Sequence, residues 1–393
     1  MLTKAVSQKY LNDALISVHA KRANCLFETA WALTGQANLT ISSLGANKAG
    51  SAYVKHKIKS VDRLVSNEKL HKEIPIIYKH FFQPIIVCAP ILYILVDWSG
   101  CCRQDIHMLR ASIVHNGRSI TIYNEIHPQK KCGNRQVQNQ FLISLKKMIP
   151  IGKNVVIITD AGFATPWFKA VLKLGWDYIG RLTSYTMIRQ EKSEKWVKVS
   201  SFNKTKSSRI KYIGRALIGK ASETPVYGHI YRYKGKKKNR KDKSRYPQQN
   251  KRFSNLYKVP WILATSLKKD NYGGKFIKNM FANRMQIEQN FRDEKSARFG
   301  FGWRLGRTND MKRIAILCLI AHIAAFFLLK IGIMAEKLGL HKRFQVNTEK
   351  KRVLSLLTLA KQIIKHQPTS TLEKNYTDGI KQLIASYEEL SLW

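Results

Sequence analysis

Apolar and polar residues recur at helical spacing in the first 67 residues of the chain. The segments YLNDALISVHAKRANCLFETAWALTG and YVKHKIKSVDRLVSN read as short amphipathic helices, and the turn-rich SSLGANKAGSA joins them. Gly45 and Gly50 have the spacing of a phosphate-binding loop, but Ser51 stands where that loop requires lysine. We therefore interpret this stretch as a turn between helices. The pattern predicts a small, basic helical domain over residues 1–70.

From residue 84 onward the pattern changes to that of buried strands. ILYILVD, which ends at Asp97, and VVIITD, which ends at Asp160, are almost continuously apolar, as strands covered on both faces are. Between them, HMLRASIVHNGRSITIYNEI predicts a hairpin around Asn116, and a helix follows over about residues 136–148. A helix in PWFKAVLKLG and a strand in WDYIGRLT come next. This alternation predicts an α/β protein with a mixed sheet flanked by helices.

A strongly basic segment interrupts the α/β pattern. Residues 187–258 contain only short β-like pieces, and residues 232–252 hold eleven Lys and Arg against one acid, with tyrosines interleaved. Such a run is either a solvated loop or an arm that grips DNA through charge and stacking. Lys236, Lys237 and Lys238 are its candidate DNA contacts.

The last part of the chain is helical by its periodicity. Helical spacing returns at Lys275 after the strand-like PWILATSL, and it extends to a C-terminal region that includes VLSLLTLAKQII. Residues 314–334 are nearly long and apolar enough to span a bilayer, but His322 and Lys330 interrupt them. We expect a buried core helix there, with a membrane helix as the alternative.

The charge balance restricts the function. The 393 residues include 69 Lys and Arg but only 25 Asp and Glu, a formal charge of +44, and 44% of the residues are hydrophobic. A folded protein with this excess is typical of one that binds nucleic acid, although a lysine-rich bias that improves solubility is an alternative. The six cysteines form no CxxC pair, which argues against zinc ribbons and disulfide scaffolds. The N-terminus lacks the apolar stretch of a signal peptide, so we expect a cytoplasmic protein.

Because acids are scarce, those at functional positions are informative. Asp97 and Asp160 each end an apolar strand; if the two strands are parallel neighbours, both carboxylates emerge at one sheet edge, where they need a shared cation. Each could also be an ordinary strand-end acid or helix N-cap.

A third acid is expected from a helix. In FANRMQIEQNFRDEKSARFG, five residues fall at spacings of three or four and share one helical face: Phe281, Arg284, Glu288, Phe291 and Lys295. The alternative is a surface ladder of ion pairs. Three carboxylates suit two Mg²⁺ ions, with Mn²⁺ as a substitute, and such a pair of ions catalyses phosphodiester displacement. No HExxH, GxSxG or complete Walker loop is present.

These motifs resemble a known family. VDWSG at Asp97, ITDAGFATPWFKAVLKLGWDYIGR at Asp160 and RMQIEQNFRDEKS at Glu288 together resemble the ribonuclease-H-like DDE transposases of the bacterial insertion-sequence-four family, most closely the Tn-ten type. The family's Tyr-Arg-Glu-Lys signature maps onto Phe281, Arg284, Glu288 and Lys295, with phenylalanine in place of tyrosine.

The resemblance implies cut-and-paste transposition of an insertion sequence. Asp97, Asp160 and Glu288 would hold two Mg²⁺ ions for end nicking, hairpin formation and opening, and strand transfer into target DNA. Arg284 and Lys295 would bind phosphates, and Trp261 would stack on a flipped base, unless it is simply a strand aromatic. Phe281 would lie at the same DNA surface without the hydroxyl contact.

The resemblance also implies a domain plan and partners. The catalytic core would comprise residues 84–186 and 265–335, interrupted by a β-rich insertion over residues 187–264. The helical C-terminal region, residues 336–393, would serve dimerisation. Double-stranded DNA, both transposon ends and target, and a second copy in a synaptic dimer would be the partners, with no membrane involved. The alternatives to an active transposase are a DNA-binding repressor with an inert nuclease fold and an unrelated ribonuclease-H-like nuclease.

Overall fold

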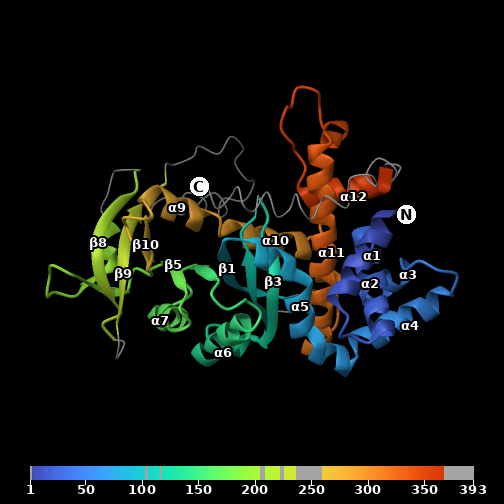
Figure 1. Cartoon of the computed structure of the whole chain (residues 1–393), viewed down its shortest axis with the longest axis horizontal. Helices are drawn as coiled ribbons and strands as arrows, with labels where there is room; N and C mark the ends of the chain where they lie inside the picture. The colour runs from blue at the N-terminus through green and yellow to red at the C-terminus, as the bar shows by residue number, and fades with distance from the viewer. Residues whose placement is uncertain are drawn as a thin grey trace.

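The computed structural model describes residues 2–101, 105–115, 117–203, 209–221, 225–235 and 259–366. Its centre is a ten-stranded sheet in the order β3-β2-β1-β4-β5-β10-β9-β8-β6-β7 (Figure 1). The strands are β1 (Ile91–Gly100), β2 (Ile106–Ile113), β3 (Ile120–Pro128), β4 (Asn154–Thr159), β5 (Asp177–Arg181), β6 (Met187–Gln190), β7 (Val197–Lys198), β8 (Lys211–Ile218), β9 (Val226–Tyr233) and β10 (Trp261–Thr265).

The strand directions confirm the predicted α/β fold. β1 pairs antiparallel with β2 and parallel with β4, and β4 pairs parallel with β5. β2 and β3 form the expected hairpin, in which Gly117 has a φ of +79° that suits glycine; Asn116 lies outside the described residues. The resulting mixed sheet, with helices around it, is consistent with a ribonuclease-H-like core.

Helices cover both faces of this sheet. Strand register aligns Ile94 with Ile157 and Ile157 with Tyr178, so these three side chains share one face. Tyr178 stacks on Phe168 of α7 (Thr165–Lys173), at 4.4 Å between ring centroids. On the opposite face, Tyr93 contacts Phe276 of α9 (Gly274–Ala282). Odd-numbered β1 residues, which include Asp97, therefore face the side covered by α9.

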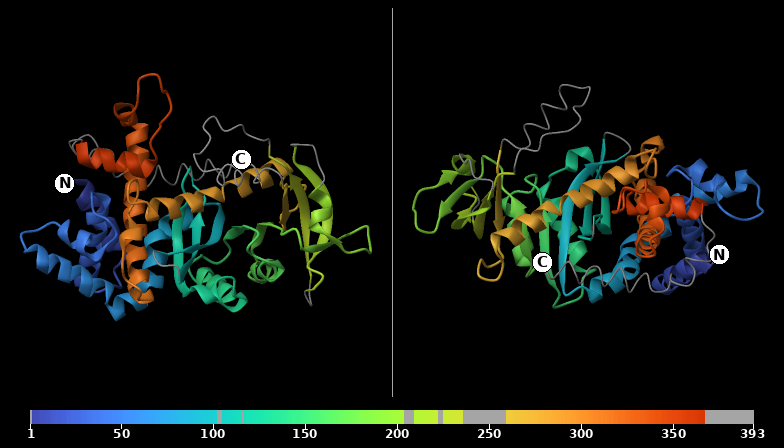
Figure 2. Two further views of the ribbon diagram at one scale, coloured as in Figure 1. Left: turned by 180° about the vertical axis from the view of Figure 1, so that it is seen from behind. Right: turned by 90° about the horizontal axis from the view of Figure 1, so that it is seen from above.

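Two further helices complete the surroundings of the core sheet. α6 (Arg135–Lys146) contacts α7, and α10 (Met285–Lys295) contacts β1. Figure 2 shows α9 and α10 following one another along the sheet. The predicted helix at 136–148 and the predicted return of helical structure at Lys275 are both confirmed within one or two residues.

The N-terminal helices lie on the far side of α11 (Met311–Lys337) from the sheet (Figures 1 and 2). They are α1 (Leu2–Ala14), α2 (Ala20–Thr34), α3 (Ile41–Ala46) and α4 (Val54–Val65). The next helix, α5 (Glu68–Cys88), contacts both α11 and β3. α11 is long and apolar enough to cross a membrane, but nearly all of its apolar residues are buried inside the protein. The expectation of a core helix at this position is thus confirmed.

Two helices were not predicted from the pattern. α3 lies within the stretch interpreted as a turn; residues 47–53 form the actual connection between α3 and α4. α5 carries Pro75 and Pro84 inside a helix of 21 residues, so residue 84 lies within the last part of a helix and not at the beginning of a strand region. Its apolar residues, among them Phe81 and Phe82, are buried against α11, and this packing offsets the cost of the prolines.

The strands that follow β5 extend the same sheet. β10 lies between β5 and β9, and β8, β6 and β7 continue outward from β9. The β-like pieces predicted over residues 187–258 are therefore joined to the core through β10. At the other end of the chain, α12 (Leu356–His366) packs its apolar side on α11: a Cβ on Gly332 would lie 2.4 Å from the Leu356 carbonyl oxygen.

Candidate active site

The two aspartates of the apolar strands lie at one edge of the sheet. In the parallel pair of β1 and β4, Val96 is opposite Thr159. Asp97 and Asp160 are the next residues along the two strands, so they lie side by side. β4 ends just before Asp160, whereas β1 continues past Asp97 to Gly100, so Asp97 is not the strand end that the sequence predicted. The side-by-side placement is the one that the sequence predicted if the strands were parallel neighbours.

Glu288 reaches this edge from the first turn of α10. It lines a cleft of about 650 Å³ whose residues are Asp97, Trp98, Ser99, Asp160, Arg284, Glu288, Phe291, Arg292, Lys295, Ser296 and Arg304. All three predicted acids therefore share one cleft. Two of its cations, Arg292 and Arg304, were not singled out from the sequence. Arg292 follows Glu288 by four residues, a signal that helical spacing offered, whereas Arg304 is brought in only by the fold.

The predicted helical face is not continuous. α9 ends at Ala282 and α10 begins at Met285, and the turn between them is tight: the Arg284 amide donates to the Phe281 carbonyl at 3.0 Å. The prediction that Phe281 shares one helix with Glu288 is wrong, because this turn separates them. Arg284, Glu288, Phe291 and Lys295 still line one cleft.

Asp97 carries the perturbed carboxylate of the site. Burial, together with the negative charges of Asp160 and Glu288, raises its pKa to about 7, although Arg284 opposes this shift. Its Oδ1 atom accepts a hydrogen bond from the Trp98 amide at 2.8 Å. Like charges brought together in a partly buried cleft favour a cation between them.

Arg284 is the cation that the chain itself places there. Its Nη2 atom lies 2.6 Å from Oε1 of Glu288, and its Nη1 atom lies 3.4 Å from Oδ2 of Asp97. Asp160 instead accepts a hydrogen bond from the Gly162 amide at 2.8 Å. The guanidinium thus ties together two of the three acids in this conformation.

The donor set fits a hard divalent ion, although the acids do not form a ready-made cluster. Among the described residues, no three His, Cys, Asp or Glu side chains lie close enough together to hold a metal ion. Oxygen ligands are nevertheless what Mg²⁺ and Mn²⁺ prefer, and Asp97, Asp160 and Glu288 supply carboxylate oxygens only. Glu288 would have to exchange its contact with Arg284 for the ion.

Of the remaining predicted DNA contacts, Lys295 lines the cleft, whereas Trp261 and Phe281 are not among its lining residues. Lys295 donates to the Ser99 hydroxyl at 2.8 Å. Trp261 is half-buried and contacts both Tyr233 and Phe281, with 5.0 Å between the Trp261 and Phe281 ring centroids. The Phe281 side chain is only 4% exposed, so its ring packs into the core.

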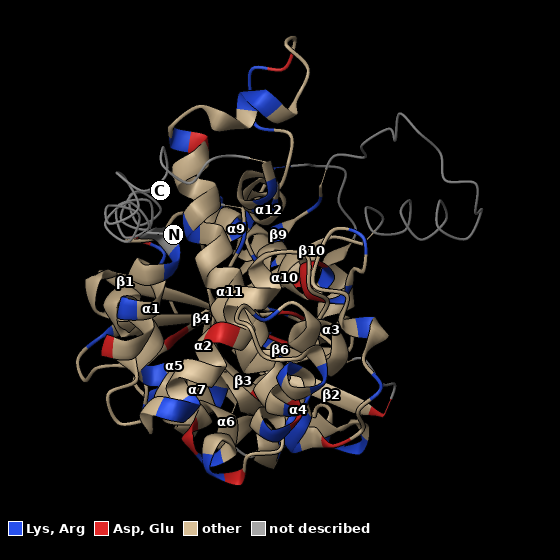
Figure 3. Cartoon of the chain, turned by 90° about the vertical axis from the view of Figure 1, so that its right-hand side faces the viewer, with Lys and Arg blue, Asp and Glu red and all other residues tan. Residues whose placement is uncertain are grey.

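The distribution of charge is broad. Figure 3 shows Lys and Arg on most of the helices and loops drawn, with far fewer acids. Lys236, Lys237 and Lys238, with most of the basic run, lie outside the described residues. The exposed side of α4 carries Lys55 and His56, beside Tyr53.

Comparison with known proteins adds the family. Residues 96–324 match the family model described as "Transposase DDE domain", a span that begins one residue before Asp97 and includes Asp160 and Glu288. The curated proteins contain no match.

Proposed function

Because the chain belongs to the transposase DDE domain family, we propose that it carries out cut-and-paste transposition of an insertion sequence, as a member of the insertion-sequence-four family of the Tn-ten type. The observation that carries this proposal is the convergence of Asp97, Asp160 and Glu288 in one basic cleft. A transposase acts on DNA, and the formal charge of +44 suits that partner.

The three acids would bind two Mg²⁺ ions, or Mn²⁺ in their place. Bound there, these ions would activate a water or a 3′-hydroxyl and stabilise the leaving oxygen in phosphodiester displacement. Asp97 and Asp160, held by rigid neighbouring strands, would set the position of the site, and Glu288 would complete it from α10. In this scheme the same cleft serves end nicking, hairpin formation and opening, and strand transfer.

The basic residues around the acids would hold the DNA backbone. Arg284 and Lys295, with Arg292 and Arg304, line the cleft and offer guanidinium and ammonium donors to phosphates. Trp261 would stack on a flipped base; Phe281 would support its ring, since the two are in contact. Lys236, Lys237 and Lys238 would extend the grip from the basic run.

The domain plan follows from the same reasoning. Residues 1–70 would bind the terminal inverted repeats, with the exposed side of α4 as the reading surface. Residues 84–186 and 265–335 would form the catalytic core and residues 187–264 the β-rich insertion. Residues 336–393 would serve a synaptic homodimer. The apolar face of α12 is already buried within the chain, so the contact would use other residues of this region.

The setting would be the bacterial cytoplasm, at the nucleoid, and no membrane would be involved. A truncation after residue 345 tests the dimer: loss of paired-end complexes supports a C-terminal interface, and their retention places the interface elsewhere.

Cleavage of the element's own terminal repeats tests the main proposal. Purified protein with Mg²⁺ or Mn²⁺ should nick those repeats, and Asp97→Asn, Asp160→Asn or Glu288→Gln should abolish nicking while end binding persists. Glu191→Gln, which removes an exposed carboxylate paired with Arg215, is the control and should cleave normally. A site variant with normal cleavage would refute the assignment of that acid. An absence of divalent-dependent nicking by the unsubstituted protein would favour an inert, DNA-binding repressor.

A further inference from the structure

Arg110 is a fully buried charge beside the candidate active site. It lies on β2 directly opposite Asp97 of β1 in the antiparallel register, so both side chains are on the same face of the sheet. Its Nε atom donates to Oδ1 of Asn124 on β3 at 3.1 Å. A guanidinium with no exposure needs an anion nearby, because the cost of burying an unpaired charge is several kcal/mol.

Glu294 on α10 supplies that anion in a two-point contact. Nη1 and Nη2 of Arg110 donate to Oε1 and Oε2 of Glu294 at 2.6 and 2.8 Å. The guanidinium also lies over the ring of Phe291, 4.6 Å from its centroid. Glu294 is 3% exposed, and the sheet and α10 are thus joined by one of the most directional contacts that side chains make.

His322 lies next to Glu294 on the other side of the pair, and Tyr78 contacts His322. Nε2 of His322 on α11 lies 3.3 Å from Oε1 of Glu294, and the Tyr78 hydroxyl of α5 lies 2.6 Å from Nδ1 of His322. Burial lowers the pKa of His322 to about 4, helped by Arg110, so its ring is neutral at pH 7. Burial alone would raise the pKa of Glu294, but Arg110 and His322 outweigh it and hold that pKa at about 2. The pair is therefore ionised at neutral pH.

The position of Glu294 on α10 links the pair of Arg110 and Glu294 to two of the candidate catalytic acids, Glu288 and Asp97. Glu294 follows Glu288 by six residues, which places the two side chains about 120° apart around the helix. One points into the cleft and the other into the core. The next residue, Lys295, contacts Ser99, two positions beyond Asp97 on β1. Fixing Glu294 on Arg110 thus fixes both the rotation of α10 and its displacement along β1.

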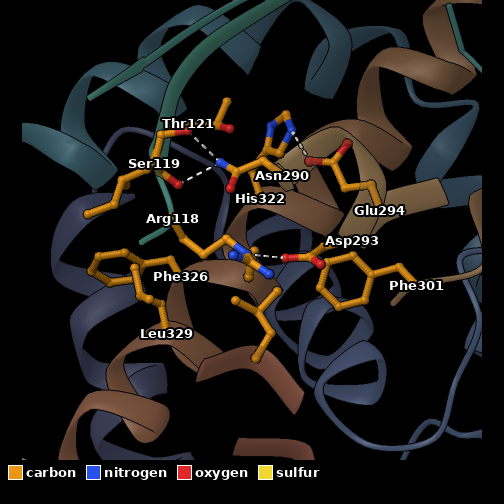
Figure 4. A pocket seen from close by; sticks show the side chains of 13 residues that line it. Arg118, Ser119, Thr121, Asn290, Asp293, Glu294, Phe301, His322, Phe326 and Leu329 are labelled. Atoms are coloured by element: carbon orange, nitrogen blue, oxygen red, sulfur yellow. Dashed lines mark hydrogen bonds and ion pairs between the residues drawn. The ribbon is translucent and has the colours of Figure 1, made fainter. Parts of the chain in front are cut away.

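Other polar contacts hold the same helix, and one of them provides a comparison. Figure 4 shows Asn290 directed at Ser119 and Asp293 paired with Arg118, next to His322 and Glu294. Nε of Arg118 lies 2.7 Å from Oδ2 of Asp293, with side chains 20% and 13% exposed. This second pair joins α10 to the β2–β3 connection and not to the strand that faces Asp97.

We propose that Arg110 and Glu294 are positioning residues that set the distance between Glu288 and Asp97 for metal binding. This inference rests on the proposed function. Stability alone does not account for a buried pair, because apolar residues of similar size often stabilise such a site as well or better. What apolar residues cannot supply is a two-point contact that defines one orientation of the helix. Residues that orient metal ligands typically influence metal affinity by ten- to a hundredfold.

The test is to replace both charges together. In Arg110→Met/Glu294→Met no buried charge is left unpaired, so the variant should fold with a midpoint of thermal unfolding equal to or above that of the unsubstituted protein. We expect its affinity for Mn²⁺, measured by electron paramagnetic resonance of free Mn²⁺, to fall at least tenfold. Without metal, hydrogen exchange of amides over residues 285–295 should become faster while global stability is unchanged.

A conservative variant and a matched control complete the test. Arg110→Lys keeps the charge but replaces the two-point contact, so it should lose Mn²⁺ affinity to an intermediate degree. Arg118→Met/Asp293→Met removes the neighbouring, partly buried pair and should leave that affinity within about twofold, because this pair joins α10 to the β2–β3 connection and not to the strand beside Asp97. Normal Mn²⁺ affinity in Arg110→Lys, or in a folded Arg110→Met/Glu294→Met, would overturn the positioning role. Failure of the unsubstituted protein to bind Mn²⁺ would instead refute the proposed metal site, and hydrogen exchange would still decide whether the pair orders α10.

Discussion

The guanidinium of Arg284 lies 2.6 Å from the carboxylate of Glu288, one turn along α10, and also reaches Asp97 at 3.4 Å. The chain thereby neutralises two of its three cleft acids with its own cation. A divalent ion and Arg284 would compete for the same carboxylate oxygens, and a DNA phosphate would compete with those acids for Arg284. Metal loading and DNA binding are therefore expected to favour one another.

Removing Arg284 should separate these two effects. Arg284→Gln frees Glu288 and Asp97 from their intramolecular partner and removes a positive charge from the site, so Mn²⁺ affinity without DNA should rise about fivefold, equivalent to about 1 kcal/mol. DNA binding should weaken, and the slope of log affinity against log salt should decrease by about 0.9 for one lost phosphate contact. Titration of Mn²⁺ by electron paramagnetic resonance and of DNA by fluorescence anisotropy measures both.

Arg292→Gln is the matched control for this prediction. Arg292 lines the same cleft but is exposed. It follows Glu288 by one helical turn, whereas Arg284 precedes Glu288 by one turn. The Arg292→Gln substitution should weaken DNA binding without a comparable gain in Mn²⁺ affinity. A loss of Mn²⁺ affinity in Arg284→Gln would show that Arg284 supports the metal site.

Neutralising Asp97 should stabilise the metal-free protein. Burial and the charge of Asp160 raise the pKa of Asp97 from 3.8 to about 7, so the folded state retains a proton that the unfolded chain has released. Ionised Asp97 therefore destabilises the fold increasingly from about pH 4 to pH 7, and constantly above that. Asp97→Asn should raise the free energy of unfolding at pH 8 by about 4 kcal/mol and have little effect near pH 4.

Urea denaturation in a chelating buffer at pH 4.5 and pH 8 measures this difference. Asp105→Asn, at an exposed position just before β2, should change stability by less than about 0.5 kcal/mol at either pH. Equal stability of Asp97→Asn and the unsubstituted protein at pH 8 would mean that Asp97 is not held in a repulsive site.

His115 should contribute to acid sensitivity. Its side chain is 1% exposed, and burial lowers its pKa from 6.5 to about 4. Between these values the unfolded chain binds a proton that the folded protein does not, so stability is lost as pH falls from 6.5 towards 4, by up to about 3 kcal/mol. His115→Gln should show a shallower decline of the thermal midpoint over this range. His56→Gln, at an exposed site on α4, should keep the original slope; a parallel decline in His115→Gln would contradict the assignment.

Gly45 should be essential for the packing of the N-terminal domain. A Cβ at this position would lie 2.4 Å from the Cα of Ile58, so α3 and α4 can approach this closely only with glycine. Gly45→Ala must push the two backbones apart and should cost about 1–3 kcal/mol of unfolding free energy. Gly273→Ala, with a φ of −66° and no atom within 4 Å, should cost less than about 1 kcal/mol. Equal effects of the two substitutions would exclude close packing as the cause.

The strands and the aspartates were predictable because their signals are local. A strand covered on both faces must be apolar, so β1 and β4 stand out in the sequence, and an acid at the end of each apolar run is conspicuous among only 25 acids. Helical spacing likewise singled out Glu288. The tight turn after Ala282 was not visible, because residues on both sides of it continue the same spacing.

The prolines of α5 show the opposite case. Pro75 and Pro84 are local signals against a helix, yet α5 runs through both because its apolar side is buried against α11. Tertiary packing of α5 on α11 overrides the low helix propensity of the prolines here, and no residue near them in the sequence indicates that packing. For this reason the first strand begins at Ile91, after the end of α5, and not near residue 84.

By itself, the sequence determined the class of sheet, the three candidate acids and the nucleic-acid partner, since each depends on residue type and on spacing within a single element. Only the tertiary structure decided that Glu294 is a core residue paired with Arg110, 184 positions away, and that Arg284 lies between Glu288 and Asp97. The physical reason is that burial and electrostatic pairing depend on which elements meet in space. An acid in a run such as RDEKS has the same appearance in the sequence whether it faces solvent, a metal site or a buried guanidinium.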